Sequence, residues 1–369
     1  TNLGHPCQIM SDIMTFEELK GPITNKKIAW LGDGNNIVYS LIEASVQFNF
    51  QLAIACPKKF KPNKLIVFSR DEYKQSAMAE KYPKEKYDCI RYFIGDVRDL
   101  NRLTLAMQGV DYVVHAAALK QVDIAEYNPM ECVKTNVGGT ENVVKAALSE
   151  NVLKAISLST DKASDPINLY GATKLTSDKI FVSANNIVGD KHPTRFAVVR
   201  YGNVAGSRGS VVPIFKKLIE QGSRELPITD DKMTRFWIRL NHAVNFVLKS
   251  FKRMQGGEIF IPKIPSIKLI DLAKAMAPKL NHKIVGIRPG EKLHEKMCSI
   301  NESYLTLNFK DHYVIKPSIR FYDKNINFSQ NKLNEIGQPV PKDFEYRSDN
   351  NTHFLTVQEI IKLNKDLLI

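Results

Sequence analysis

A tyrosine and a lysine four residues apart, Tyr170 and Lys174, have the types and spacing that most directly indicate acid–base chemistry in this sequence. A helix is predicted from Leu169 onwards, and residues four apart on a helix share one face, so the ammonium group can lie near the phenol. A neighbouring cation favours the phenolate, which predicts that Tyr170 can act as a base near neutral pH. The alternative interpretation is an ordinary surface pair, because this spacing occurs by chance in many helices.

A second pair, Asp161 and Lys162, lies a short loop upstream and adds a carboxyl group and a second amine. Residues 155–158 form an apolar run of strand length, so this pair and Thr160 are predicted to lie where a strand ends. The ends of parallel strands line the ligand crevice of open α/β sheets. We therefore expect an acid, an amine and the phenol of Tyr170 to meet in one cleft, which favours a catalytic role over a surface pair.

The elements that must position these residues follow an alternating pattern. Short runs rich in β-branched and aromatic residues alternate with helical periodicities such as that at 140–148. The runs are 65–69, 90–94, 112–116, 155–158 and 196–199. This alternation predicts an α/β fold with a Rossmann-like, doubly wound parallel sheet. Beyond Tyr201 the pattern changes to helices near 213–221, 242–254 and 269–280 with short strands such as 258–261, which predicts a smaller C-terminal, substrate-binding part.

The bulk composition is that of an ordinary soluble globular protein, with 43% hydrophobic and 25% charged residues in 369. The length corresponds to about two to three domains. No apolar run is long enough to cross a membrane, so no membrane association is expected. The chain opens at Thr1 with neither an initiator methionine nor a signal-peptide pattern, which suggests a processed start or a piece of a longer protein.

The cysteines, the histidines and the net charge indicate the cellular compartment of the protein and the kinds of partner that it can bind. Five scattered cysteines without a C-x-x-C pair predict reduced thiols in a cytoplasmic protein, and eight histidines without ligand spacing predict no metal site. The formal net charge of +13 favours anionic partners. Charge alone does not choose between nucleic acid and nucleotide-like small molecules. The lysines are not clustered with aromatic residues, however, so nucleic acid is not expected.

Several stretches between residue 61 and the C-terminus match motifs of one protein family, and they occur in the same order as in that family. They are KPNKLIVFSRDE, RYFIGDVRD, HAAALKQVDIAEYNPMECVKTN, LSTDKASDPINLYGATKL, RYGNVAGSRGSVVPIFKKLI, ELPITDDKMTRFW, GGEIFIPKIPS, GIRPGEKLHE and SDNN. In them the chain resembles the soluble, inverting UDP-N-acetylglucosamine 4,6-dehydratases of the extended short-chain dehydrogenase/reductase superfamily. Many motifs in order are far more specific than one. Epimerases of the superfamily usually have small residues in place of Asp161-Lys162, and the membrane-bound relatives have Met in place of Tyr170.

Residues 1–60 carry a different resemblance. The stretches TNLGHPCQIMSDIMTFEELKG and KKIAWLGDGNNIVYSLIEASVQFNFQLAIACP resemble an internal piece of an ornithine carbamoyltransferase, including its His5-Pro6-Cys7-Gln8 motif. Its other motifs, Ser-Thr-Arg-Thr and His-Cys-Leu-Pro among them, have no counterpart here, so a structural role for His5 is favoured over a carbamoyltransferase fragment. We therefore expect a chimera. In it, residues 1–60 supply the first strand and helix of the sheet, 61–205 form an NADP-binding Rossmann-like core, and 206–369 bind the substrate.

The N-terminal segment stands where the dehydratase family has a glycine-rich loop for the dinucleotide pyrophosphate. In its place the chain has Gly32 and Gly34 after a predicted strand at 28–31, and Asp33 adds a negative charge. An extra predicted strand at 51–56 also lengthens the spacing from these glycines beyond the ~20 positions of the dinucleotide fingerprint. Two interpretations stay open: an NADP-dependent dehydratase, or a non-catalytic chimera that keeps the substrate half and cannot hold its cofactor.

The segment after the strand at 65–69 bears on which cofactor binds. Arg70 and Lys74 resemble the family's clamp for the extra phosphate of NADP. Asp71 and Glu72 keep NAD open, because a carboxylate at this place can accept the ribose hydroxyls. The resemblance implies further cofactor contacts at Ser69, Asp96, Val97, Ala116, Ala118, Tyr170 and Lys174.

The resemblance also implies a role for each catalytic residue. Tyr170 removes the proton of the sugar 4-hydroxyl while hydride leaves carbon 4, and Thr160 hydrogen-bonds the 4-oxygen. Lys162, if burial and nearby Lys174 keep it neutral, removes the proton of carbon 5. Asp161, if protonated, expels the 6-hydroxyl as water. Return of hydride to carbon 6 and reprotonation on the opposite face complete a dehydration that inverts carbon 5, the first step of pseudaminic acid synthesis.

The substrate contacts are implied by the same resemblance. They are Lys120 and Asn203 near the sugar or its phosphates, Arg288 and Glu291 on the uridine-diphosphate side, and Arg208 as a further diphosphate contact. The alternative for 288–291 is a polar turn. The family assembles into homo-oligomers, and we expect the same of this chain.

Overall fold

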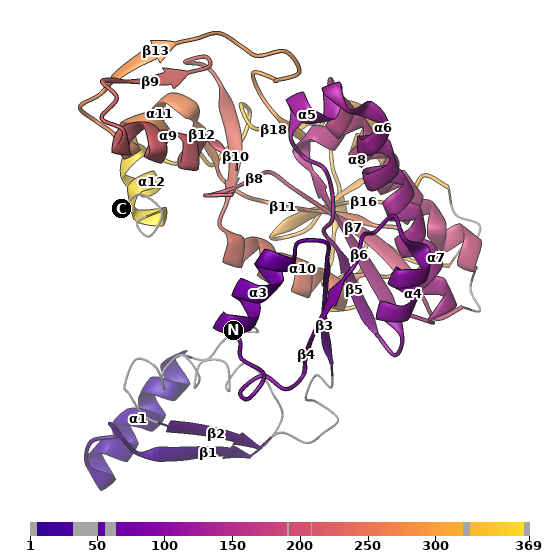
Figure 1. The fold of residues 1–369 in the computed structure, drawn as a ribbon, viewed down its shortest axis with the longest axis vertical. Coiled ribbons are helices and arrows are strands. Elements are labelled where there is room, and N and C mark those ends of the chain that lie inside the picture. Colours follow the sequence, from indigo (N-terminus) through magenta and orange to yellow (C-terminus); the bar gives the residue numbers. More distant parts are fainter. Residues whose placement is uncertain are drawn as a thin grey trace. The chain divides into compact units, whose positions relative to one another are not determined.

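The protein is represented by a computed structural model that describes residues 6–31, 51–55, 64–189, 192–207, 209–319 and 325–364 (Figure 1). Two compact units are present: Thr1–Val67 with Asp71–Phe93, and Phe68–Arg70 with Ile94–Ile369. The predicted site residues Gly32, Gly34 and Arg208 lie outside the described residues. None of the helices in the described ranges is long and apolar enough to cross a lipid bilayer.

The smaller unit begins with helix α1 (Pro6–Lys20), followed by strand β1 (Lys27–Leu31) and strand β2 (Gln51–Ala55). These strands run parallel and form a two-stranded sheet of their own, with Lys27 opposite Gln51. The predicted strands at 28–31 and 51–56 are thereby confirmed. In the described residues neither strand pairs with the large sheet, so a contribution of this segment to that sheet stays a prediction.

Strands β3 (Leu65–Ser69) and β4 (Ile90–Ile94) form a second two-stranded sheet and are linked by helix α3 (Glu72–Lys81). Both strands have the bounds predicted from their β-branched and aromatic residues. Asp71 caps α3, because its carboxylate accepts a hydrogen bond from Lys74 N at 2.9 Å.

The larger unit is built on a seven-stranded sheet in the order β17-β15-β16-β11-β7-β6-β5. Its parallel part contains β5 (Tyr112–His115), β6 (Lys154–Thr160), β7 (Arg195–Tyr201) and β11 (Ile259–Pro262). Antiparallel strands extend it: β16 (His312–Ile315), β15 (Thr306–Asn308) and β17 (Gln338–Pro339). The predicted α/β fold with parallel strands is confirmed, and the antiparallel extension is an addition to it.

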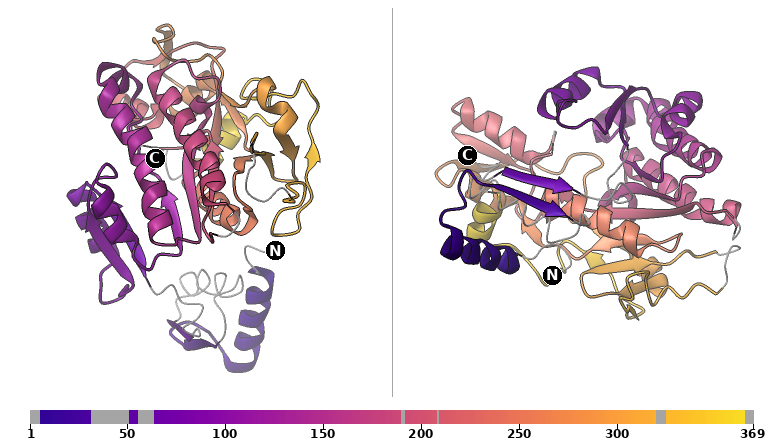
Figure 2. Two further views of the ribbon diagram at one scale, coloured as in Figure 1. Left: turned by 90° about the vertical axis from the view of Figure 1, so that its right-hand side faces the viewer. Right: turned by 90° about the horizontal axis from the view of Figure 1, so that it is seen from below.

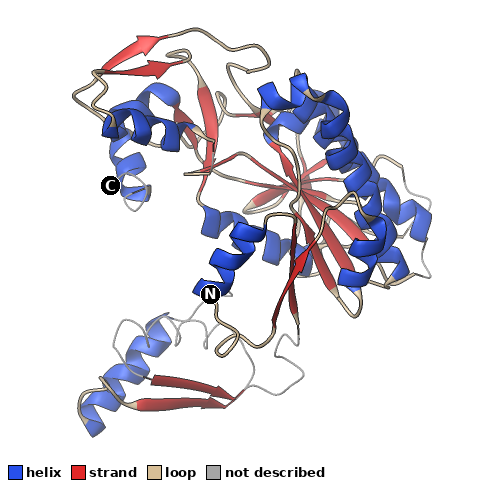
Figure 3. Cartoon of the chain, viewed as in Figure 1, coloured by secondary structure: helices blue, strands red, loops and turns tan. Residues whose placement is uncertain are grey.

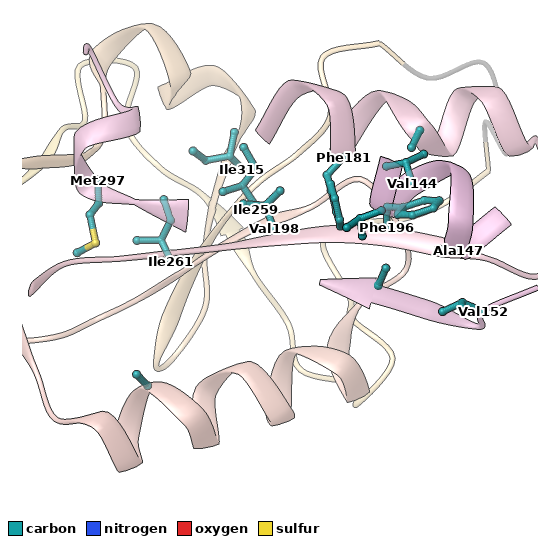
Figure 4. Close-up of a cluster of buried hydrophobic side chains, with 14 of the residues drawn as sticks. Val144, Ala147, Val152, Phe181, Phe196, Val198, Ile259, Ile261, Met297 and Ile315 are labelled. Atoms are coloured by element: carbon teal, nitrogen blue, oxygen red, sulfur yellow. The ribbon is translucent and has the colours of Figure 1, made fainter. Parts of the chain in front are cut away.

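Helices cover both faces of this sheet, as the alternating side chains of β7 show. Phe196 and Val198 belong to one cluster with Phe181 of helix α8 (Leu169–Val188) and with helix α7 (Gly139–Ser149) (Figure 4). Ala197 and Val199 belong to another, with helix α10 (Leu240–Arg253). Figure 2 and Figure 3 show the helices on either side of the strands. The sheet is therefore doubly wound, as predicted.

The remaining elements are mostly short connections and a small C-terminal layer. They are α4 (Leu100–Met107), α5 (Val122–Tyr127), α6 (Pro129–Val133), the π-helix η2 (Lys134–Gly138), the 3-10 turn η3 (Asp161–Ala163), β8 (Asn203–Val204), α9 (Val211–Glu220), β9 (Glu225–Ile228), β10 (Thr234–Ile238), β12 (Ser266–Lys268), α11 (Leu269–Met276), β13 (Asn281–Ile284), β14 (Lys296–Cys298), η4 (Ile300–Leu305), β18 (Tyr346–Arg347) and α12 (Val357–Leu363). A separate hydrophobic cluster from Ala205 to Ile360 gives this layer its own core. The predicted domain boundaries at 60/61 and 205/206 stay predictions.

Candidate active site

A cavity of about 520 Å³ lies in the larger unit, where β5, β6 and β7 end. The carboxyl ends of neighbouring parallel strands meet at one edge of a sheet, which is why residues far apart in sequence converge there. The predicted site residues that line the cavity are Ala116, Ala118, Lys120, Thr160, Asp161, Lys162, Tyr170, Lys174, Asn203, Arg288 and Glu291. The expected convergence of acid, amine and phenol in one cleft is therefore present.

The turn η3 presents Asp161 and Lys162 immediately after β6. β6 ends at Thr160, as the apolar run predicted. The Thr160 hydroxyl accepts a hydrogen bond from Lys162 N at 3.3 Å and donates one to Asp161 Oδ1 at 3.0 Å. These bonds orient the turn, so Thr160 has a structural role in addition to the implied contact with substrate.

Helix α8 places Tyr170 in its first turn. Asn168 caps the helix, accepting a hydrogen bond from Gly171 N at 2.8 Å, and donates one to Gly290 O at 2.8 Å. Glu126 adds an acceptor for Leu169 N at 2.7 Å. The start of α8 is therefore tied to the loop that contains Arg288, across the cavity.

Gly171 allows α8 to approach the turn that contains Lys162. A Cβ at this position would lie 2.3 Å from Lys162 O and 3.0 Å from Pro166 Cβ. We expect Gly171→Ala to displace the turn, to lower the turnover number at least tenfold and to lower the free energy of unfolding by about 1–3 kcal/mol, as overpacking does.

Steady-state kinetics and thermal unfolding of Gly171→Ala measure both effects. Gly138→Ala is the matched control, because a Cβ there would meet nothing within 4 Å. Wild-type kinetics in Gly171→Ala would show that the close approach does not position Lys162.

The predicted lowering of the pKa of Tyr170 by Lys174 is wrong. Burial raises the pKa of Tyr170 to about 12, and the strongest opposing charge is Lys162 rather than Lys174. Lys174 is itself buried, which lowers its pKa, and Asp178 opposes that shift. Helical spacing puts two side chains on one face, but burial and the nearest charge decide the protonation state.

The prediction that Lys162 is neutral is also wrong for this structure. Burial disfavours its ammonium form, but two carboxylates outweigh burial and raise its pKa above the usual range. Asp161 Oδ1 lies 3.2 Å and Glu295 Oε1 lies 2.9 Å from Lys162 Nζ. Arg235 opposes them only in part. Lys162 is therefore an ammonium group at neutral pH.

Burial of Asp161 acts towards the predicted acid, whereas its ion pair with Lys162 acts against it. The residue is 1% exposed, and burial raises its pKa; Lys162 opposes this shift, whereas Glu295 adds to it. Oδ1 receives the hydrogen bonds from Thr160 and Lys162. Oδ2 is buried and has no hydrogen-bond partner within the described part of the chain. This oxygen is the natural position for a proton that can be donated to a ligand.

Two residues that contribute to the site were not singled out from the sequence, Glu295 and Arg235. Both line the cavity, and Arg235 Nε lies 3.9 Å from Glu295 Oε1. Glu295 lies in the quoted stretch GIRPGEKLHE, and Arg235 lies in ELPITDDKMTRFW. Neither has a spacing that ties it to Asp161 or Lys162, so the sequence contained no signal for the contact.

The residues predicted to contact a cofactor are found in three places. Ala116, Ala118 and Lys174 line the cavity. Arg70 Nη1 lies 3.4 Å from Asp96 Oδ2, and Arg98 also binds this carboxylate, at 2.9 Å. Ser69 O accepts a hydrogen bond from Gly95 N at 3.1 Å, and Val97 is buried. In the smaller unit, Lys74 Nζ forms an ion pair with Asp71 at 2.7 Å.

The residues predicted to contact the substrate share the cavity with the catalytic candidates. Asn203 Oδ1 and Glu291 Oε2 are buried and have no hydrogen-bond partner among the residues that the structure describes. Glu291 N donates a hydrogen bond to Arg288 O at 3.1 Å, and Gly290 has a φ of 78°. Residues 288–291 therefore do form the turn considered above, and that turn borders the cavity.

Comparison with known families and proteins adds independent information. Residues 51–317 match the family described as polysaccharide biosynthesis protein. The chain is 60% identical over 306 residues to the UDP-N-acetylglucosamine 4,6-dehydratase (inverting) of Campylobacter jejuni subsp. jejuni serotype O:2, and the match covers 83% of this chain and 90% of that protein.

Solved structures give a consistent result for the fold. The X-ray structure of Pen from Bacillus thuringiensis has a TM-score of 0.73 and 34% identity, over 94% of this chain and 99% of that chain. The structure of DesIV, a dTDP-glucose 4,6-dehydratase from Streptomyces venezuelae with NAD and TYD bound, has a TM-score of 0.56 and 19% identity, over 72% and 87%. At this identity, the DesIV likeness concerns the fold alone.

Proposed function

The chain belongs to the polysaccharide biosynthesis protein family, and we propose that it is an inverting UDP-N-acetylglucosamine 4,6-dehydratase. The observation that carries the proposal is that Asp161, Lys162 and Tyr170 line one cavity. The reaction would convert UDP-N-acetylglucosamine to UDP-2-acetamido-2,6-dideoxy-β-L-arabino-hex-4-ulose and water. Its product would serve pseudaminic acid or another surface glycan.

A nicotinamide cofactor fits the residues along one wall of the cavity. Ala116 and Ala118 leave room there, and buried Lys174 also lines the cavity, where its side chain could bind a ribose hydroxyl. When bound, the nicotinamide would accept hydride from carbon 4 and return it to carbon 6. We propose NADP, because the Arg70 side chain is 56% exposed and can still reach a phosphate. NAD is the alternative that Asp71 and Glu72 keep open.

Asp161 and Lys162 can reach the required protonation states by sharing one proton. Transfer of a proton from Lys162 to the carboxylate of Asp161, whose Oδ1 lies 3.2 Å from Nζ, converts the ion pair into a neutral amine and a neutral acid. The amine then takes the proton of carbon 5, and the acid donates its proton to the departing 6-hydroxyl, which leaves as water. Lys162 is again an ammonium group and Asp161 a carboxylate, so the pair returns to its starting charge.

Tyr170 would accept the proton of the 4-hydroxyl, with Thr160 bound to the same oxygen. To act as this base the phenol must first release its own proton to solvent, and burial opposes that release because it raises the pKa of Tyr170 to about 12. Lys162 acts in the opposite sense and favours the phenolate. The positive charge on Lys162 therefore supports removal of the proton from the 4-hydroxyl. The same residue then removes the proton of carbon 5.

Incubation of the purified protein with UDP-N-acetylglucosamine and either NADP or NAD tests the proposal. We expect a 4-keto-6-deoxy product lighter by one water, with deuterium at carbon 5 when the solvent is D₂O, and a higher rate with NADP. A fluorescence titration with each cofactor identifies the non-catalytic chimera, which would show neither binding nor product. Cofactor binding without any keto sugar from UDP-N-acetylglucosamine would refute the dehydratase assignment.

We also propose that the protein is a cytoplasmic homo-oligomer, as its dehydratase resemblance implies. The five scattered cysteines are consistent with a reducing compartment. Light scattering after size exclusion measures the assembly directly, and the mass of a single chain would refute it.

A further inference from the structure

Glu295 is the carboxylate that the sequence did not connect to Asp161 and Lys162. Hydrogen bonds fix its main chain. It directly precedes β14 and is 1% exposed. Glu295 N donates to Ser348 Oγ at 2.9 Å, and Ser348 N donates back to Glu295 O at 2.8 Å. Ser348 Oγ lies in turn 2.7 Å from Thr234 Oγ1, beside Arg235. The backbone of Glu295 is thus fixed on both sides.

The side chain of Glu295 points its charge at Lys162. Oε1 lies 2.9 Å from Lys162 Nζ and 3.9 Å from Arg235 Nε. Oε2 is buried without a hydrogen-bond partner in the part of the chain described. Burying a carboxylate with one oxygen unsatisfied is costly unless its charge is compensated. Lys162 supplies that compensation, and in return its flexible four-carbon chain is held between two fixed carboxylates.

We propose that Glu295 is a positioning residue that holds the amine of Lys162 at the cavity and sets the pH at which this amine becomes available as a base. This rests on the proposed dehydratase function, in which Lys162 takes the proton of carbon 5. After that step Lys162 carries a positive charge, and Glu295 stabilises this charge. Glu295 thereby increases the basicity of Lys162 without itself touching the sugar.

The charges around Lys162 come from every element packed against it. Asp161 adjoins it in the same turn, Glu295 lies beside it from the residue directly before β14, and Arg235 comes from β10. Lys292, whose ammonium donates to Ser164 O at 2.7 Å, and the phenol of Tyr170 complete the set. Burial favours the neutral amine, and Arg235 acts in the same sense. Asp161 and Glu295 oppose both and prevail, so removal of either carboxylate must lower the pKa of Lys162.

Competitive acetylation with acetic anhydride across a pH series, read by peptide mass spectrometry, reports the ionisation of Lys162 without substrate or cofactor. In Glu295→Gln we expect the onset of labelling to move down by one to two pH units, as expected for loss of one opposite charge at close range. Glu295→Asp keeps the charge and should restore the wild-type onset. Arg235→Met should move the onset in the opposite direction, which keeps the test informative if Glu295→Gln does not fold.

The matched control is Glu345→Gln. Glu345, which directly precedes β18, also binds a lysine through a short contact, 2.6 Å to Nζ of Lys296 in β14. It does not line the cavity, and its removal should leave the labelling of Lys162 unchanged. An unchanged onset in Glu295→Gln, or an equal shift in Glu345→Gln, overturns the proposal.

The pH profile of the turnover number gives a second readout that a purely structural role would not change. Because loss of Glu295 lowers the pKa of Lys162, the fall of activity at alkaline pH, where the Asp161–Lys162 pair loses its shared proton, should begin at lower pH in Glu295→Gln, with little change in KM. A loss by one constant factor at every pH would contradict a positioning role. If the wild-type protein makes no keto sugar, the dehydratase proposal fails, whereas the labelling result still decides the role of Glu295.

Discussion

Asp161→Asn should lower the rate of water loss from the sugar by about 10²–10⁴-fold, the range typical of removing a general acid. Asparagine has nearly the same size and can still accept the hydrogen bonds from Thr160 and Lys162 at one oxygen. It cannot deliver a proton from the position of Oδ2, which is buried and has no partner among the described residues. The protein should therefore remain folded and still bind its sugar.

The rate of keto-sugar formation, followed by mass spectrometry, measures this effect. Asp165→Asn is the matched control: it lies four residues further on, its side chain is 50% exposed, and it pairs with Lys296 at 2.8 Å. Asparagine also tolerates its φ of 46°. We expect the control to keep wild-type activity. More than a tenth of the wild-type rate in Asp161→Asn would exclude Asp161 as the acid.

Arg200→Met should lower the free energy of unfolding by about 3–5 kcal/mol, because it leaves the buried carboxylate of Asp178 and the partly buried one of Glu302 without their cation. Arg200 lies in β7 and is fully buried. Its guanidinium lies 3.4 Å from Asp178 Oδ2 and 3.2 Å from Glu302 Oε1, and it donates to Met297 O at 2.9 Å. Methionine fills much of the volume but satisfies none of these groups.

Denaturant unfolding followed by circular dichroism measures the loss. Arg347→Met removes a half-exposed arginine from a surface cluster and should cost no more than about 1 kcal/mol. Adding Asp178→Asn to Arg200→Met should recover part of the loss, since one uncompensated charge disappears. A loss below 1 kcal/mol in Arg200→Met would show that water or relaxation replaces the ion pairs.

The ion pair between Arg200 and Glu302 predicts that the stability of the fold depends on pH. Burial tends to raise the pKa of Glu302, but Arg200 together with hydrogen bonds from Ser299 outweighs burial and lowers it. A carboxyl group with a lowered pKa stabilises the fold above its unfolded-state pKa, and this stabilisation disappears as the pH falls through the folded-state value. Wild-type protein should therefore lose more stability on acidification than Arg200→Met does.

The local elements of the fold followed from the sequence because they depend on neighbours along the chain. The strands β3 and β4 have the predicted bounds, and β6 ends directly before Asp161. Alternation of strands and helices predicted the parallel, doubly wound sheet. The antiparallel strands β15 to β17 were not predicted, because their pairing joins short segments that have no distinctive periodicity.

Several of the residues that line the cavity were also indicated by the sequence. The motifs that carry the dehydratase resemblance contain Asp161, Lys162 and Tyr170, and all three line the cavity. The resemblance of residues 1–60 to a carbamoyltransferase stays a prediction, and so does the implied effect of that segment on cofactor binding.

By itself, the sequence determined which residues could do the chemistry, the elements that carry them and the family to which the chain belongs. Only the tertiary structure decided their charges: Lys162 rather than Lys174 acts on Tyr170, and Glu295 from a distant segment holds Lys162 as an ammonium group. The physical reason is that spacing along a helix or strand is a local property. A protonation state, in contrast, depends on burial and on every charge within a few ångströms, whatever part of the chain supplies it.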